Sequence, residues 1–268
     1  DPPAQAARPL PDRLTAMAPP PARNAALKSD PRLDAYFSGE EGRRRATREM
    51  FDRAAAGYDV AERWTGLGSG PWYRRDVLRR RGLKPGMHVL DVAAGTGLVT
   101  VAAHGIVGPG GRVVALDPSP GMLGELRKKL AVETIEGYAE DIPLPDATVD
   151  FVSMGYALRH VGDLDRAFAE YFRVLRPGGQ VCLMEISRPA GRLGQALLSG
   201  YLRGVVPLLA RLAGSRADVG RLWEYYGDTI DAAIEPERIL STLRAAGFGE
   251  VRCPVTFGIF REYLARKP

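Results

Sequence analysis

Residues 87–97 read MHVLDVAAGTG, a short and almost continuously apolar run that ends in a loop with two glycines. A run of this kind is typical of a strand buried on both faces of a parallel sheet. A helical stretch, LVTVAAHGIV at 98–107, and a second apolar run, RVVALD at 112–117, follow it directly. Strand, glycine turn, helix and strand in this order predict the first βαβ unit of an α/β fold.

The alternation of strands and helices continues toward the C-terminus. Ser119 is a suitable N-cap for the next helix, and Pro120 suits its first position. Later strands are expected at 134–141, 149–158, 180–187, 250–257 and 259–266, with helices over 163–175 and from 235 to 247. The last two strands are close enough in sequence to pair antiparallel. We therefore expect a doubly wound, mostly parallel, Rossmann-like sheet.

The composition divides the chain of 268 residues into segments. Residues 1–31 are crowded with Pro, Ala and Arg and are expected to be a tail, because they cannot bury enough apolar surface to offset their ordering entropy. Residues 32–82 are expected to be an N-terminal helical segment, with an amphipathic helix at 46–60. Residues 83–268 then form the α/β domain. Inside it the alternation lapses at 188–233, a length that is uncommon without a function, and we interpret this insertion as a helical lid over the substrate.

Composition also narrows the function classes. The 37 Lys plus Arg and 32 Asp plus Glu give a net charge of +5, which suits an acidic ligand or an anionic membrane but is too small and dispersed to indicate nucleic-acid binding. With 2 cysteines and 3 histidines, neither a disulfide framework nor a metal centre is expected. No apolar run reaches the roughly 18 residues that a membrane span needs. The few cysteines and the lack of an export signal favour a cytoplasmic location by default.

The glycine loop and the acid after the second strand predict a ligand site. In a doubly wound sheet, ligands bind at the carboxyl ends of the strands, where the strand order reverses. Gly95 and Gly97 let the backbone approach a ligand, and Asp117 is placed to accept hydrogen bonds from both hydroxyls of a ribose. These features indicate an adenosine-bearing cofactor. A dinucleotide site normally has a further glycine where this chain has Thr100, whereas S-adenosylmethionine has no pyrophosphate and does not need it.

Several stretches together resemble the class I S-adenosylmethionine-dependent methyltransferases, in particular the UbiE-type C-methyltransferases of ubiquinone and menaquinone biosynthesis. The resemblance runs from about Met50 to the C-terminus. It rests on MFDRAAAGYD, VLDVAAGTGLVT, EDIPLPDATVDFVSMGYALRHV, RVLRPGG, MEISRP and the closing AAGF and GI. It implies a seven-stranded sheet with an antiparallel last strand, S-adenosylmethionine as cofactor and S-adenosylhomocysteine as product. In one respect the chain departs from the family: Asn usually follows Arg159, where this chain has His160.

The resemblance also implies roles for cofactor residues. Tyr58 would cap the methionine end, Met122 would pack on the adenine, and Asp141 with the Ile142 amide would bind the adenine edge. Met122 reads equally well as core, and Asp141 as a solvated loop acid. The full set predicted to bind the cofactor is Tyr58, Asp91, Ala93, Gly95, Thr96, Gly97, Asp117, Pro118, Met122, Asp141, Ile142 and Gly155.

Catalytic groups are expected near the end of the fourth strand, which faces the methyl group of the cofactor. Tyr156, Arg159 and His160 lie there. A neutral imidazole is the obvious base at neutral pH, and Arg159 could stabilise a phenolate. A helix-start residue bonded to the backbone is an equally good interpretation of His160. Cys182, within an apolar strand, is interpreted as inert core.

The insertion and the end of the fifth strand are expected to bind the acceptor. Apolar runs, aromatic residues and arginines at the edge suit a small, hydrophobic aromatic substrate and shallow contact with an anionic bilayer; core-packing helices are the plainer alternative. The residues predicted to bind the substrate are Glu185, Tyr201, Trp223, Tyr225 and Tyr226. The favoured reaction is methyl transfer to a ring carbon of a quinol or phenol. O- or N-methylation of a small molecule, a non-catalytic binding or docking protein, and a homodimer stay open.

Overall fold

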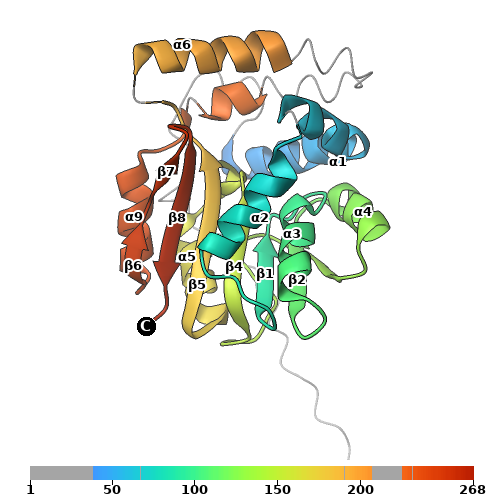
Figure 1. Ribbon diagram of the computed structural model, residues 1–268, viewed down its shortest axis with the longest axis vertical. Coiled ribbons are helices and arrows are strands. Elements are labelled where there is room, and N and C mark those ends of the chain that lie inside the picture. The colour runs from blue at the N-terminus through green and yellow to red at the C-terminus, as the bar shows by residue number, and fades with distance from the viewer. Residues whose placement is uncertain (1–38, 67, 190, 207–224, 231) are drawn as a thin grey trace, which may run out of the picture.

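An eight-stranded sheet forms the centre of the computed structural model, which describes residues 39–66, 68–189, 191–206, 225–230 and 232–268. The strands are ordered β3-β2-β1-β4-β5-β8-β6, and the short β7 pairs with β8 beside this path. Helices cover both faces of the sheet (Figure 1). The predicted doubly wound α/β fold is therefore confirmed.

Five strands run parallel and carry the ligand site at their carboxyl ends. They are β1 His88–Val92, β2 Arg112–Asp117, β3 Glu133–Glu136, β4 Val149–Gly155 and β5 Leu175–Ile186. The central strand β1 lies between β2 and β4, with Leu90 paired to Val114 on one side and Val152 on the other. Since the chain turns from β3 back across β1 to β4, the order reverses between β1 and β4. A crevice opens at such a reversal.

The C-terminal strands close the sheet in the antiparallel sense, as expected. β8 Phe260–Arg266 pairs antiparallel with β5, with β6 Gly249–Arg252 and with β7 Val255–Thr256. The predicted single strand at 250–257 is divided into β6 and β7 at Cys253 and Pro254. Proline has no N–H to donate to a ladder, so the pairing is interrupted there, and the sheet has eight strands where seven were expected.

Helices form a layer on each face of the sheet. Their bounds are α2 Gly70–Arg80, α3 Leu98–Val107, α4 Pro120–Lys129, α5 Leu164–Val174, α9 Pro236–Ala245 and the 3₁₀ turn η2 Leu158–His160. Val77 of α2 and Val99 of α3 belong to one buried cluster with Phe151 and Cys182 of the sheet. The helices α5 and α9 pack on the other face. The predicted N-cap is present, because the Ser119 hydroxyl accepts from the Met122 N–H.

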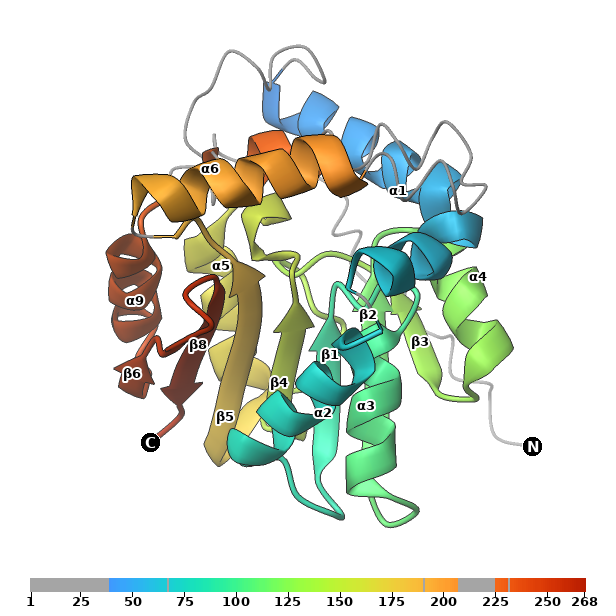
Figure 2. The same cartoon turned by 45° about the horizontal axis from the view of Figure 1, so that its top comes forward.

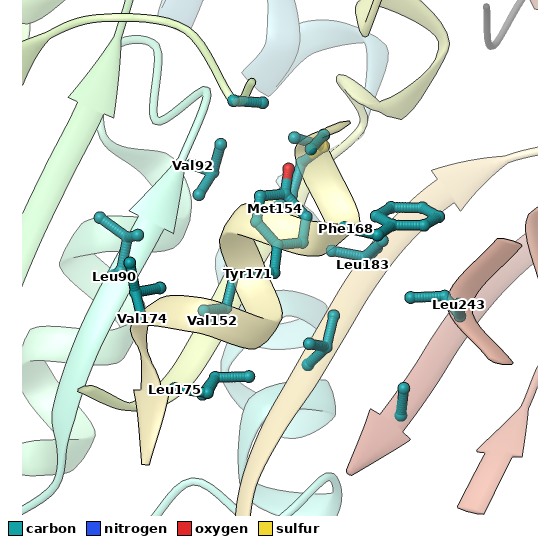
Figure 3. Packing of buried hydrophobic residues seen from close by; sticks show 14 of the residues in the cluster. Leu90, Val92, Val152, Met154, Phe168, Tyr171, Val174, Leu175, Leu183 and Leu243 are labelled. Carbon is teal, nitrogen blue, oxygen red and sulfur yellow. The ribbon is translucent and has the colours of Figure 1, made fainter. Parts of the chain in front are cut away.

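The larger core lies between the sheet and α5. Figure 3 shows Val152 and Met154 of β4 and Leu183 of β5 facing Phe168 and Tyr171 of α5. All five side chains are fully buried. Burying a side chain of this size stabilises the fold by about 1.5–3 kcal/mol, so this layer fixes the sheet from which the site residues project.

The first helix, α1 Gly39–Thr65, is longer than the predicted 46–60 and lies across the carboxyl ends of the strands (Figure 2). Two acids dock it. Asp52 accepts from the Ser119 hydroxyl and from the Gly121 N–H at the start of α4, where the helix dipole favours a carboxylate. Asp59 accepts from Thr96 and pairs with Lys129. The helix therefore roofs the crevice.

The predicted insertion lies partly within the described residues. It contributes α6 Arg192–Gly200 and the π-helical turn η3 Tyr201–Val205, and α6 has no buried residue. Figure 2 places α6 near α1 on the carboxyl-end side of the sheet. The tail at 1–31, residues 32–38 and the middle of the insertion at 207–224 lie outside the described residues. Among the helices that are described, none combines the length and apolarity that crossing a bilayer requires.

Candidate active site

A cavity opens at the carboxyl ends of β1, β2 and β4, beneath α1. Its empty volume is about 1120 Å³, counting the space open to solvent. Most of the predicted cofactor residues line it, namely Tyr58, Ala93, Gly95, Thr96, Asp117, Pro118, Met122 and Gly155. Four of the predicted set, Asp91, Gly97, Asp141 and Ile142, do not line it. The cavity lies where the strand order reverses, which is where ligands bind in open α/β sheets.

The glycine loop needs its two glycines for different reasons. Both adopt a left-handed backbone, with φ of 56° at Gly95 and 86° at Gly97. A Cβ on Gly95 would meet nothing within 4 Å, so this position is open to a ligand. A Cβ on Gly97 would lie 2.2 Å from the Leu126 side chain of α4. Gly95 therefore faces the cavity, whereas Gly97 allows helix α4 to pack against the loop.

Asp117 ends β2 with both carboxylate oxygens facing backbone donors. One oxygen accepts from the Gly95 N–H at 2.8 Å, and the other accepts from the Ser119 N–H at 2.8 Å. A carboxylate has about four lone-pair directions, so each oxygen can still accept from a ribose hydroxyl. Burial raises the pKa of Asp117 to about 6, against the effect of the two N–H donors. The carboxyl is therefore ionised at neutral pH but close to titration.

Asp91 lies behind the loop and does not line the cavity. Its side chain is fully buried and accepts from Thr100 at 2.6 Å and from Ser153 at 2.7 Å. Burial raises its pKa to about 6, and the two hydroxyl donors oppose that shift. Asp91 thus ties β1 to α3 and β4. The same contact explains Thr100 at the position where a dinucleotide site would have glycine.

A different acid from the predicted one lines the cavity. Glu140 lines the cavity and accepts from the Gly162 N–H at 2.9 Å and from Arg44 at 3.0 Å. Asp141 is exposed, and the Ile142 N–H donates to Glu170 at 2.9 Å. The sequence indicates an acid near this point, but the turn that follows Tyr138 decides which of the two carboxylates points inward.

Aromatic side chains form the other end of the cavity. Phe51 and Tyr58 of α1 meet Tyr226, and the hydroxyls of Tyr58 and Tyr226 lie 2.9 Å apart. Burial raises the pKa of both tyrosines, so both stay protonated at neutral pH. Tyr226 was predicted from sequence to bind substrate, and Phe51 was not. This wall is apolar, with hydroxyl groups at one edge, and suits a flat aromatic acceptor.

His160 lines this end, with one ring nitrogen bonded and the other open. Its ring stacks on Tyr225 at 5.4 Å, and Nδ1 lies 3.2 Å from the Tyr225 hydroxyl. Nε2 is buried and has no hydrogen-bond partner among the described residues. Burial, reinforced by the charges of Arg159 and Arg43, lowers the pKa of His160 well below 6.5. The imidazole is therefore neutral at neutral pH. Tyr225 does not line the cavity and acts on it through His160.

Tyr156 follows the last residue of β4 and adopts a left-handed conformation with φ of 61°. Its N–H donates to the Met184 carbonyl at 2.7 Å, and its side chain lines the cavity. Burial raises the pKa of its hydroxyl well above the usual 10. Tyr156 is therefore a hydrogen-bond donor at neutral pH and not a base.

Arg159 and Glu185 are buried beside the cavity rather than in it. Arg159 Nη1 donates to Glu185 at 2.6 Å and to the Tyr156 carbonyl at 2.7 Å, and its Nε donates to Thr229 at 3.0 Å. The guanidinium also lies 4.6 Å from the centre of the Tyr226 ring. Both residues line a second, smaller cavity. The sequence predicted that these two residues contact the acceptor. Neither lines the main cavity, so this geometry does not provide that contact.

The remaining predicted substrate residues belong to the insertion. Tyr201 stands at the start of η3 and does not line either cavity. Trp223 lies outside the described residues. Their roles stay predictions.

The residues around the cavity fit S-adenosylmethionine. Asp117 keeps acceptor capacity for a ribose, the space beside Gly95 is open, and Arg74, which lines the cavity, has a buried guanidinium nitrogen without a partner among the described residues.

Comparisons with known proteins agree with this fit. The model of the ubiE/COQ5 methyltransferase family matches residues 39–267. A demethylmenaquinone methyltransferase of Symbiobacterium thermophilum is 34% identical over 220 residues, which cover 78% of this chain and 87% of the relative. A ubiquinone/menaquinone biosynthesis C-methyltransferase UbiE of Hahella chejuensis is 32% identical, covering 74% of this chain and 82% of the relative.

Solved structures support the fold. A SAM-dependent methyltransferase from Aquifex aeolicus superposes with a TM-score of 0.55 at 21% identity, covering 73% of this chain and 89% of that chain. At this identity the likeness shows the fold alone. The family match and the curated relatives also extend over most of the sequence, and the relatives are 34% and 32% identical, so they show the family. The chain belongs to the ubiE/COQ5 methyltransferase family and is an S-adenosylmethionine-dependent methyltransferase.

Proposed function

We propose that the protein transfers the methyl group of S-adenosylmethionine to a ring carbon of a quinol or related phenolic acceptor. The observation that carries the proposal is the aromatic wall of Phe51, Tyr58 and Tyr226, with His160 beside it, whose buried Nε2 has no partner among the described residues. The names of the curated relatives, which refer to demethylmenaquinone and to ubiquinone/menaquinone biosynthesis, support the same acceptor class.

The cofactor supplies an electrophilic methyl group on a positively charged sulfur. On transfer to carbon, the electron pair of the sulfur–methyl bond would stay with sulfur as the ring carbon bonds to the methyl group. The protein must align the ring carbon with the methyl group and keep water out. Helix α1, which covers the cavity, and the aromatic wall of Phe51, Tyr58 and Tyr226 both align the acceptor and keep water out.

His160 is the proposed base. The ring carbon must lose its proton after methylation, and the phenol must ionise before it. If the Tyr225 hydroxyl donates to Thr47 Oγ1, 3.4 Å away, it accepts from the His160 Nδ1–H, 3.2 Å away. This tautomer leaves a lone pair on Nε2, which has no other partner among the described residues. A general base of this kind contributes about 10²- to 10⁴-fold to a rate.

Arg159 is proposed as a positioning residue. Its guanidinium packs on the face of Tyr226 and fixes the Tyr156 carbonyl, and Glu185 neutralises its charge at 2.6 Å. The Tyr156 hydroxyl remains as a donor to an acceptor oxygen, because the hydroxyls of Tyr58 and Tyr226 bond to each other.

The test is a methylation assay with naphthohydroquinones and benzohydroquinones that carry deuterium on the ring. Transfer to carbon releases the ring deuterium, whereas transfer to oxygen retains it. Release of deuterium with methyl incorporation supports the proposal. Methyl incorporation with retention of deuterium would favour transfer to oxygen, one form of the runner-up reaction. Binding of the cofactor with no turnover of any acceptor would favour a non-catalytic role.

Shallow contact with an anionic membrane is a further part of the proposal. Leu193 and Leu197 lie one turn apart on α6 and are 75% and 66% exposed, and such residues suit an interfacial helix. Co-sedimentation with phosphatidylglycerol vesicles, lost in the Leu193→Ser, Leu197→Ser double variant, would support it. A homodimer is proposed from sequence alone, and light scattering tests it.

A further inference from the structure

Arg74 is a buried cation that faces the cavity, and the catalytic proposal above does not use it. It lies on α2, is 3% exposed and lines the cavity. Its Nη2 forms an ion pair with Glu62 of α1. Its Nη1 is buried and has no hydrogen-bond partner among the described residues. A buried donor of a charged group that stays unpaired is costly, so this nitrogen is poised for an acceptor that enters the cavity.

The surroundings hold the guanidinium in place. A Cβ on Gly70 would lie 2.5 Å from Arg74 Nη1 and 2.5 Å from Glu62, so glycine makes the room for the pair. On the cavity side, the guanidinium carbon lies 5.7 Å from the centre of the Tyr156 ring. Glu62, Gly70 and Tyr156 thus fix Arg74 beside the end of β4.

The position of Arg74 in the cavity indicates which part of the cofactor it would contact. Asp117 ends β2, and Tyr156 follows β4, which is two strands away across β1. If Asp117 holds the ribose, the adenine points toward Met122 and Glu140, and the methionine end points toward β4 and Arg74. The carboxylate is the only anionic group of the cofactor. A guanidinium–carboxylate contact is a strong, charge-assisted hydrogen bond.

A second arginine that lines the same cavity, Arg48, also has a buried nitrogen, Nε, without a partner among the described residues. Arg44, Arg48 and Asp52 share one face of α1, being four residues apart. Arg44 contacts Glu140 and Asp52 contacts Ser119, so Arg48 belongs to the adenine and ribose side.

We infer that Arg74 binds the methionine carboxylate of S-adenosylmethionine through Nη1 and so selects cofactors that carry the amino-acid end. The inference rests on the cofactor site of the proposed function. The competing role for Nη1 is a bond to an acceptor oxygen.

The experiment is calorimetric titration of the full chain with S-adenosylmethionine, S-adenosylhomocysteine and 5′-methylthioadenosine, which lacks the amino-acid end. Arg74→Met should weaken binding of the first two ligands about 10- to 100-fold, the effect of one charge-assisted hydrogen bond. Binding of 5′-methylthioadenosine should change by less than about threefold. Arg75→Met, which removes the same charge from an exposed position of α2, should leave all three affinities unchanged.

Two further variants keep the test decisive. Arg74→Met leaves Glu62 without its ion pair, so the double variant Arg74→Met, Glu62→Gln is measured beside it and should show the same selective loss. Arg48→Met is the competitor variant. Selective loss in Arg48→Met but not in Arg74→Met would overturn the inference.

Equal losses for all three ligands in both Arg74 variants would also overturn it, because Arg74 would then only shape the cavity. Unchanged binding of S-adenosylhomocysteine with a raised KM for the acceptor would assign Nη1 to the acceptor instead. If the unaltered protein binds 5′-methylthioadenosine but neither larger ligand, the cofactor assignment itself fails. If it binds all three and Arg74→Met behaves like Arg75→Met, only the role of Arg74 fails.

Discussion

The two ends of the cavity are built by different means. At the cofactor end, Gly95 and Asp117 are 22 residues apart and are joined through one βαβ unit. At the aromatic end, Tyr58 and Tyr226 are 168 residues apart, and Thr47 and Tyr225 are 178 apart. The first end is made by loop backbone and a strand end, the second by side chains that meet only after α1 docks.

Because the two ends are built differently, we expect changes at each end to affect different properties of the enzyme. We expect the backbone of the glycine loop and the Asp117 carboxylate to bind the cofactor, so changes there should act on folding and cofactor affinity. The aromatic end holds the proposed base, His160, and the proposed donor, Tyr156, so changes there should act on turnover. Each variant below tests one side of this division.

The largest effect is expected from His160→Ala. Loss of the base should lower kcat about 10²- to 10⁴-fold, while the affinity for S-adenosylhomocysteine stays within about twofold. Stopped assays with a hydroquinone acceptor and calorimetry measure the two quantities. His160→Asn is the matched variant, since it keeps a polar side chain without a base. Full activity in either variant would reduce His160 to a structural residue.

The next largest effect is expected at Gly97. Gly97→Ala combines a left-handed φ with a Cβ 2.2 Å from Leu126, and should lower the free energy of unfolding by about 2–4 kcal/mol. Gly95→Ala has the same conformational penalty but open space, so about 1–2 kcal/mol is expected. Urea denaturation compares them. Equal losses would mean that packing against α4 contributes nothing at this position.

The sequence could predict the cofactor end because its signals are local. The apolar run before the loop, the two glycines and Asp117 each follow from strand and turn chemistry within a short segment. Asp141 was predicted as the acid of the third strand's turn, whereas Glu140 lines the cavity, because one residue of rotation in the turn decides which carboxylate faces inward. Similarly, Gly97 has a packing role that depends on Leu126, a contact that no local pattern reveals.

The aromatic end was harder to predict for the same physical reason. His160 and Tyr226 were found from residue type and their place after β4 or in the insertion. Arg159 and Glu185 were expected to contact the acceptor, yet they neutralise each other beside the cavity. Arg74 gave no signal, because a basic helix such as α2 usually faces solvent and only its packing against Glu62 and Gly70 turns this arginine inward.

The next prediction concerns the pH dependence of cofactor affinity, which should come from Asp117 at the cofactor end. The pKa of Asp117 is about 6 in the folded protein and 3.8 for the free side chain. Protonation of Asp117 therefore stabilises the folded state most below pH 3.8. This stabilisation is lost as the pH rises through 6. Cofactor affinity should run in the opposite direction, because a ribose hydroxyl donates better to the ionised carboxylate. Affinity should fall about tenfold between pH 7 and pH 5.

The matched variant for this prediction is Asp117→Asn. It should bind S-adenosylhomocysteine about 10- to 100-fold more weakly at pH 7, with no further fall toward pH 5. Calorimetry across this range provides both curves. A variant that keeps the pH dependence of the unaltered protein would assign the titration to another group.

The smallest effect is expected at Tyr225, which reaches the acceptor only through His160. Tyr225→Phe keeps the ring that stacks on the imidazole at 5.4 Å and removes the hydroxyl 3.2 Å from Nδ1. One neutral hydrogen bond contributes about 0.5–1.5 kcal/mol, so kcat should fall by about two- to tenfold. The loss of tautomer control should also shift the acidic limb of the pH–kcat profile, which a purely structural residue would not move. Tyr201→Phe removes a hydroxyl from outside the cavity and should leave both kcat and the profile unchanged. A shifted profile in Tyr201→Phe would instead indicate that the insertion contacts the acceptor. The aromatic end would then include the insertion as well as α1 and residues 225–230.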